Sequence, residues 1–352
     1  MRDLIRKVPI PAAGVALGLA ALGNLLQPHA EALHVACGVC ALFLVVLLLA
    51  KIILFPLDIR KDMRNSILAS VSATLFMSLM QIATYLAPFA YLPAFVLWGD
   101  AVAAHAILIV WFTARFITKF KLNEVFPTYF ICYVGIVVAS ATAPTFGMEA
   151  FGHAVFWFGF ACYLVLLVVV TLRYLRHEAP ESARPLFCIY TAPMSLSIVG
   201  YLATADQPSL AFVGVMLVLA QLFFVVVLTR VPQFMRLSFY PSFAAMTFPF
   251  VITATALGQA IAFFRESGIY VHQAFDVLVA VETLIAIAMV LFVLFGLFGV
   301  RPYFAIQSDN PETVEGGIVY TSICCVFSVG CFASILGERL LQSTGRTKLS
   351  MM

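Results

Sequence analysis

Charged residues are scarce in this chain: Asp, Glu, Lys and Arg together make up 11% of its 352 residues, while hydrophobic residues make up 63%. A soluble domain of this size carries about a quarter charged residues. Outside the apolar runs there are only short loops and two ends, so no stretch is long enough to form a soluble catalytic domain. The composition excludes a soluble enzyme and predicts an integral membrane domain.

Metal and redox motifs are also missing. The eight cysteines show no spacing typical of metal ligands or of a disulfide framework, and four of them (Cys37, Cys132, Cys162 and Cys188) are each the kind of small hydrophobic residue expected in an apolar run. Cys37 and Cys40 form a C-x-x-C, but it lies within an apolar run, away from water, so we interpret it as helix packing. We expect no metal and no cofactor.

What the chain does contain is a series of ten apolar stretches of about the length that crosses a bilayer as a helix. These stretches are 9–27, 32–55, 66–87, 93–117, 127–146, 150–175, 185–205, 210–231, 241–264 and 270–298.

Serine and threonine are distributed unevenly among these stretches. The odd-numbered stretches contain 18 hydroxyl side chains and the even-numbered ones contain 4. Lipid tails accept no hydrogen bonds, so hydroxyl groups belong where protein or water can satisfy them. The alternation predicts an all-α membrane protein of ten helices, arranged as five hairpins with odd helices inside around a central pore and even helices facing lipid.

Basic residues mark one side of the predicted bundle. With ten crossings, 16 of the 20 Lys and Arg residues fall on the side of the N-terminus, whereas the opposite loops hold only Arg265. By the positive-inside rule the N-terminus is cytoplasmic, and the protein is expected in the plasma or inner membrane. The basic clusters are explained as topology signals, so we expect no nucleic-acid partner.

Four odd stretches share a proline followed by a glycine, which predicts kinked inner helices around a narrow lumen. Small residues also allow close helix packing, so each pair alone has an ordinary explanation. The predicted pore-lining residues are Pro11, Gly14, Gly18, Ser78, Pro127, Gly135, Pro193, Gly200, Thr247, Thr253 and Thr255.

The odd stretches contain no Asp, Glu, Lys, Arg or His. A cation path or a proton relay normally needs carboxylates within the membrane. A lumen of hydroxyls, helix ends and backbone, reached from a basic surface, favours an anion that is held weakly enough to leave.

Three segments carry a resemblance to a known family. Residues 7–24 (KVPIPAAGVALGLAALGN), 126–139 (FPTYFICYVGIVVA) and 240–253 (YPSFAAMTFPFVIT) resemble the first, fifth and ninth helices of the tellurite-resistance/dicarboxylate transporter family. That family often has Trp where this chain has Tyr129. The same superfamily includes the plant slow anion channels, and the resemblance covers about residues 5–300.

This resemblance implies ten helices with quasi-fivefold symmetry, frequent assembly as a homotrimer, and a pore plugged by a phenylalanine of the ninth helix. The matching residue is Phe248, which precedes Pro249. Periodicity alone leaves Phe250, on another face of the same helix, as the alternative gate.

The expected function is transport of small anions, namely a C4-dicarboxylate such as malate, a monovalent anion or the tellurite oxyanion. Channel and proton-coupled carrier both remain open. The alternative is a membrane-embedded enzyme that would use the polar residues of the outer helices, Asp100, His105, His272, Asp276 and Glu282. Glu282 lies deepest, and either proton coupling or pairing with a neighbouring helix would explain it.

The domain boundary is expected near residue 300, with the ten-helix domain in 1–300 and a tail in 301–352. The tail contains one further apolar segment, 316–336, which fits either a crossing or a helix lying beside the bundle.

Overall fold

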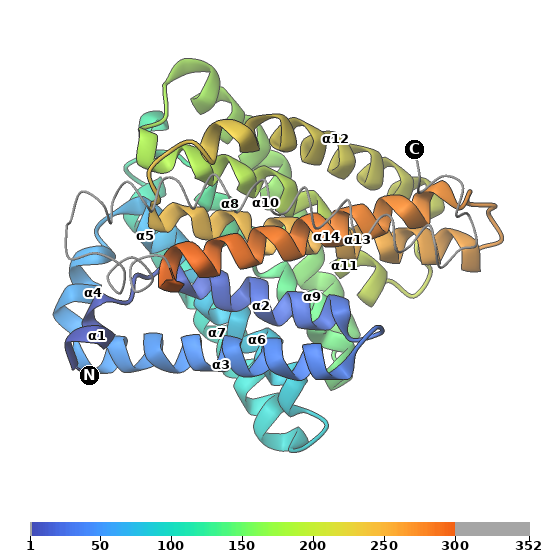
Figure 1. Ribbon diagram of the computed structural model, residues 1–352, viewed down its shortest axis with the longest axis horizontal. Helices are drawn as coiled ribbons and strands as arrows, with labels where there is room; N and C mark the ends of the chain where they lie inside the picture. The colour runs from blue at the N-terminus through green and yellow to red at the C-terminus, as the bar shows by residue number, and fades with distance from the viewer. Residues whose placement is uncertain (1, 300–352) are drawn as a thin grey trace.

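The computed structural model describes residues 2–299, and every regular element within that range is helical (Figure 1). Five hairpins follow one another along the described chain, each made of a first segment and a second helix. We call the first segments the inner segments and the second helices the outer helices. The outer helices are α3 (Glu31–Leu54), α7 (Tyr91–Phe112), α10 (Glu149–Arg176), α12 (Leu210–Phe234) and α14 (Ala274–Leu294).

The inner segments are less regular, and four of them are divided into two or more helical pieces. They are α2 (Ala12–Leu26), α5 with α6 (Ser66–Val71, Ala73–Leu86), α8 with α9 and η3 (Thr128–Tyr133, Val137–Thr142, Ala143–Phe146), η4 with α11 (Glu181–Thr191, Ala192–Thr204), and η5 with α13 (Pro241–Met246, Phe248–Glu266). Short helices complete the described chain: α1 (Arg2–Lys7), α4 (Pro56–Asp62), η1 (Thr113–Ile117), η2 (Leu122–Glu124) and η6 (Phe295–Gly299).

Burial confirms the predicted division into inner and outer helices. In the apolar windows of Ser66–Leu86, Glu181–Thr204 and Pro241–Glu266, 67%, 83% and 67% of the residues are buried, against 28–39% in the five outer helices. Nearly all of α2 is buried as well. By length and composition eight of these helices can cross a membrane, and Ala12–Leu26 and Val137–Phe146 are shorter apolar helices. The described chain is therefore an all-α membrane protein.

The prolines of the four Pro/Gly pairs lie where regular α-helix begins, rather than inside a stretch of regular α-helix. Pro11 and Pro127 occupy the N-cap positions of α2 and α8, and Pro193 and Pro249 lie in the first turns of α11 and α13. Proline fits this position because the first turn of a helix leaves its N–H groups unpaired in any case. The expectation of proline kinks is corrected accordingly.

The third inner segment bends at a glycine. The Gly135 N–H donates to the Phe130 carbonyl five residues earlier, at 3.1 Å, so the chain makes one wide turn between α8 and α9. A Cβ atom at Gly135 would collide with the Ile131 carbonyl oxygen, and hence this turn requires glycine.

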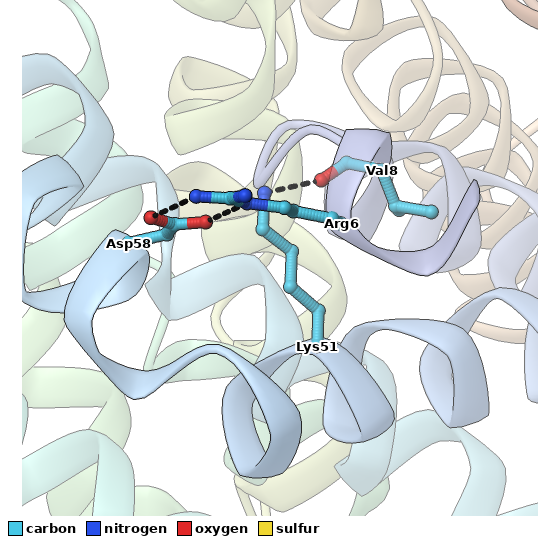
Figure 2. Close-up of polar contacts among 4 residues, drawn as sticks. All are labelled: Arg6, Val8, Lys51 and Asp58. Carbon is cyan, nitrogen blue, oxygen red and sulfur yellow. Dashed lines mark hydrogen bonds and ion pairs between the residues drawn. The ribbon is translucent and has the colours of Figure 1, made fainter. Parts of the chain in front are cut away.

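The start of α2 is anchored by polar contacts to the first hairpin (Figure 2). The Ala12 N–H donates to the Pro9 carbonyl at 3.0 Å, so the Val8 carbonyl lacks the donor that a regular helix would supply. The buried Lys51 ammonium donates to the Val8 carbonyl instead, at 2.6 Å. The Arg6 guanidinium donates to both carboxylate oxygens of Asp58, at 2.6 and 3.2 Å. These bonds hold α1 and α4 together at one end of the bundle, which we call the basic end because Arg60 and Lys61 also lie there.

The apolar segment 316–336 that was expected in the tail lies outside the described residues.

Candidate functional site

A cavity of about 280 Å³ lies between the five inner segments, toward the basic end. Its rim is polar: Asn65, Ser182 and Ser242 lie at the starts of α5, η4 and η5, and the Ser242 hydroxyl donates to the Ser182 carbonyl at 2.6 Å. Deeper in, the lining is mostly aliphatic and aromatic. The deeper lining residues include Pro11, Gly14, Leu17, Leu68, Val71, Met77, Phe130, Val134, Gly135, Leu186, Ile189, Pro193, Leu196 and Phe248. We call this space the inner cavity.

The hydroxyl groups of the inner segments contribute little to this lining, in contrast to the expectation from their number. Most of them donate to a carbonyl one turn earlier in their own helix, as Thr74 does to Val71 at 2.7 Å and Thr253 does to Pro249 at 2.8 Å. Serine and threonine commonly satisfy themselves in this way in helices. The lining residues of the inner cavity include no ionisable side chain among the described residues.

A second cavity, of about 780 Å³, is lined by the opposite ends of the inner segments and by the first part of outer helix α3, including Glu31 and His34. We call it the outer cavity. It is more polar than the inner cavity, and the Asn24 and Gln81 carboxamides within it are joined by a hydrogen bond of 2.7 Å. Thr255 lines it, whereas Phe248 lines the inner cavity. No residue lines both cavities, so a layer of packed side chains separates them.

The two phenylalanines at the start of α13 point in different directions. Phe248 is 5% exposed and lines the inner cavity. Phe250 is fully buried, and its ring meets the Phe224 ring of outer helix α12 edge-on, with the centroids 5.8 Å apart. Of the two, Phe248 is the one that borders the inner cavity, whereas Phe250 packs against an outer helix.

Helices α2 and α13 approach each other closely beside Phe248. The Thr247 hydroxyl donates to the Gly14 carbonyl of α2 at 3.0 Å. A Cβ atom at Gly18 would lie 2.6 Å from the Thr247 Cβ and 3.0 Å from the Phe248 nitrogen, so Gly18 allows this approach. Gly18 and Thr247 therefore fix where the Phe248 backbone lies, although neither lines a cavity.

The structure places the other predicted lining residues in helix contacts. Ser78 donates to the Ala13 carbonyl of α2 at 3.0 Å, and Thr253 lies 3.2 Å from the Ser195 hydroxyl of α11. Gly200 packs against the Val137 side chain of α9. Pro127 begins α8 and, like Ser78, Thr253 and Gly200, belongs to neither cavity lining.

The polar residues of the outer helices do not converge on one site. The His105 ring bonds to the Cys132 carbonyl at 2.9 Å, Asp276 pairs with Arg265 at 2.8 Å, and the His272 ring accepts the Ala274 N–H. Asp100 is exposed on α7, and Glu282 is buried on α14. No group of three or more His, Cys, Asp or Glu side chains able to hold a metal ion occurs within residues 2–299.

Two features were missed in the sequence. Gln221, on outer helix α12, lies beside the Glu282 carboxyl of α14, and a glutamine within a lipid-facing stretch could have drawn attention to it. The aliphatic lining of the inner cavity gave no signal, because leucine and valine occur throughout every stretch.

These observations define a class of protein: a membrane protein of five helical hairpins, with two cavities lined by its inner segments and Phe248 in the lining of one of them. A family model described as voltage-dependent anion channel (SLAC1) matches residues 7–298. The chain belongs to this family, and its general function is that of an anion channel or transporter. Among curated proteins compared individually, none matches the chain.

Proposed function

We propose that the protein is an anion channel whose path runs from the inner cavity to the outer cavity and is closed at Phe248. The observation that carries this proposal is the pair of cavities lined by the inner segments, with the Phe248 ring in the lining of the inner one.

The sign of the permeating ion follows from charge. The basic end carries Arg6, Lys7, Arg60 and Lys61, which raise the local concentration of anions by electrostatic attraction. The inner segments also begin at this end, and the N-terminal ends of helices carry partial positive charge. A cation would meet repulsion at the basic end and no carboxylate in the lining of the inner cavity. The carboxylate in the lining of the outer cavity is Glu31, at the start of α3.

The lining of the inner cavity favours weakly hydrated anions. Nearly all its deeper side chains are apolar, and Thr74, which is among them, already donates its proton to Val71. An entering anion gains few hydrogen bonds there. The free-energy cost of removing its hydration shell therefore determines how fast it passes through the cavity. We expect monovalent anions such as nitrate and chloride to pass faster than malate or tellurite.

Orientation and assembly complete the proposal. The basic end faces the cytoplasm of a cell bounded by the plasma or inner membrane, because cationic loops are retained on that side. Figure 1 shows α1 and α4 at one end and the α13–α14 connection at the other, which fits this orientation. From the family resemblance we propose a homotrimer with one path in each subunit. The molecular mass of the purified protein in detergent tests this assembly.

The test is flux in proteoliposomes that contain the purified protein, with nitrate, chloride, malate, tellurite and potassium compared at set membrane potentials. Anion flux in the order given, above that of protein-free liposomes, supports the proposal. Equal potassium flux would contradict anion selectivity, and saturable malate flux faster than that of nitrate would point to a carrier instead.

A further inference from the structure

The Glu282 carboxyl group is buried without a charged partner in the middle of outer helix α14. Its side chain is 1% exposed, and neither carboxylate oxygen makes a hydrogen bond. Burial of an unpaired carboxylate costs several kcal/mol, whereas a neutral carboxyl group costs much less. This packing of the helices therefore favours the neutral, protonated form of Glu282.

Glu282 faces the helix that carries Phe248. One turn before it on the same face of α14, Val279 packs over Gly258 of α13, where a Cβ atom would lie 3.7 Å from the Val279 Cγ1. From α12, the Gln221 side chain lies beside the carboxyl group, and its Nε2 atom is also buried without a hydrogen bond. Two polar groups thus lie together over the outer face of α13.

Compensating charge is absent from the described elements that pack around Glu282. The segments α2, η5 and η6 contain no ionisable residue. On α12 the ionisable residue is Arg230, near the basic end, and on α13 they are Arg265 and Glu266 in the last turn. Arg265 pairs with Asp276, which is on α14 itself but nearer the far end of the bundle.

A short chain of contacts connects this site to Phe248. Gln221 and Phe224 are three residues apart on α12 and therefore share a face. The Phe224 ring packs on the ring of Phe250, which is two residues from Phe248 on α13. Gln221, which lies beside Glu282, is thus one helical turn from Phe224. A change in packing at Glu282 can therefore reach the Phe224–Phe250 contact at the start of α13.

We propose that Glu282 is a protonation switch that controls the opening of the path at Phe248. When the carboxyl group is neutral, α12 and α14 stay packed over α13 and the path is closed. When it gives its proton to water, the carboxylate needs hydration, so the helices part beside Gln221 and release the Phe224–Phe250 contact. Anion flux therefore rises with pH. Glu282 acts by positioning α13 and does not touch the anion.

This inference rests on the proposed anion flux, and it is tested by the pH profile of that flux in proteoliposomes over roughly pH 5 to pH 9. Glu282→Gln keeps the shape of the side chain but cannot ionise, so its flux should stay low at every pH while wild-type flux rises severalfold. Glu266→Gln, which neutralises an exposed carboxylate at the end of α13, is the matched control and should follow the wild type.

A wild-type pH profile in Glu282→Gln would overturn the inference, because another group would then be the sensor. Should Glu282→Gln not fold, Gln221→Leu tests the same site. Loss of its neighbouring carboxamide should move the midpoint of the pH response upward, and an unchanged midpoint would overturn the inference. Wild-type flux that does not vary with pH would also overturn it, whereas absence of any wild-type anion flux would contradict the proposed function itself.

Discussion

Replacement of Phe248 by alanine separates a gate from a core residue, because Phe250 provides a matched control two positions away. Phe250 is fully buried and its ring meets Phe224 edge-on. Its loss should cost about 3–5 kcal/mol of stability, of which about 0.5–1.5 kcal/mol belongs to the aromatic pair. The Phe248 ring borders an existing cavity, so its removal only enlarges that space, and we expect about half that cost or less.

The effects of the two substitutions on anion flux should follow the opposite order, with the larger effect at Phe248. Phe248→Ala removes the largest side chain from the closed end of the inner cavity and should raise nitrate flux severalfold in proteoliposomes. Phe250→Ala should lower the melting temperature in detergent. At about pH 9, where Glu282 is ionised and the Phe224–Phe250 contact is already released, it should leave flux per folded molecule close to the wild-type value. The reasoning is refuted if Phe248→Ala leaves flux unchanged while Phe250→Ala raises it, since the path would then run along the other face of α13.

Three further predictions follow from the described contacts. In a background without native cysteines, Ser267→Cys should react with an impermeant maleimide added outside intact cells and Lys61→Cys should not; the reverse pattern would invert the proposed orientation. Gly18→Ala should cost about 1–3 kcal/mol by overpacking the contact between α2 and α13, whereas Gly99→Ala, with nothing within 4 Å of the new Cβ, should be neutral or slightly stabilising in thermal melts. The guanidinium beside Asp58 lowers the pKa of that carboxyl group, so its stabilising effect is complete above the ordinary carboxyl pKa of about 4 and is lost as pH falls through the lowered value. Hydrogen exchange of α1 should therefore quicken at acid pH, and Asp58→Asn should show that faster exchange at neutral pH too.

The arrangement of helices was predictable because the membrane makes unpaired polar groups expensive. The distribution of Ser and Thr separated inner from outer helices correctly, since a hydroxyl facing lipid finds few partners. The direction in which each hydroxyl points was not predictable. Thr74 and Thr253 satisfy themselves within their own helices, which leaves aliphatic side chains to line the inner cavity.

The candidate site depended on contacts between segments far apart in the chain. The composition of α13 does not distinguish Phe248 from Phe250; the position of Phe224 on α12 does. In the same way, the placement of Gln221 beside Glu282 depends on how two outer helices pack over α13, and no local pattern in either helix encodes it. Proline positions were ambiguous for a related reason, because a proline in an apolar run fits both a kink and a helix start.

The two cavities also determine where the membrane potential acts. If each cavity admits ions from its own side, the field concentrates across the thin layer of side chains between them, near Phe248. A monovalent ion that crosses this layer gains or loses close to the whole potential difference, about 2.3 kcal/mol per 100 mV. The apolar stretches of the inner segments carry no Asp, Glu, Lys, Arg or His, so the field exerts almost no force on these inner helices. Voltage in this protein therefore works on the ion in transit, and the current through an open variant should follow the applied potential without delay.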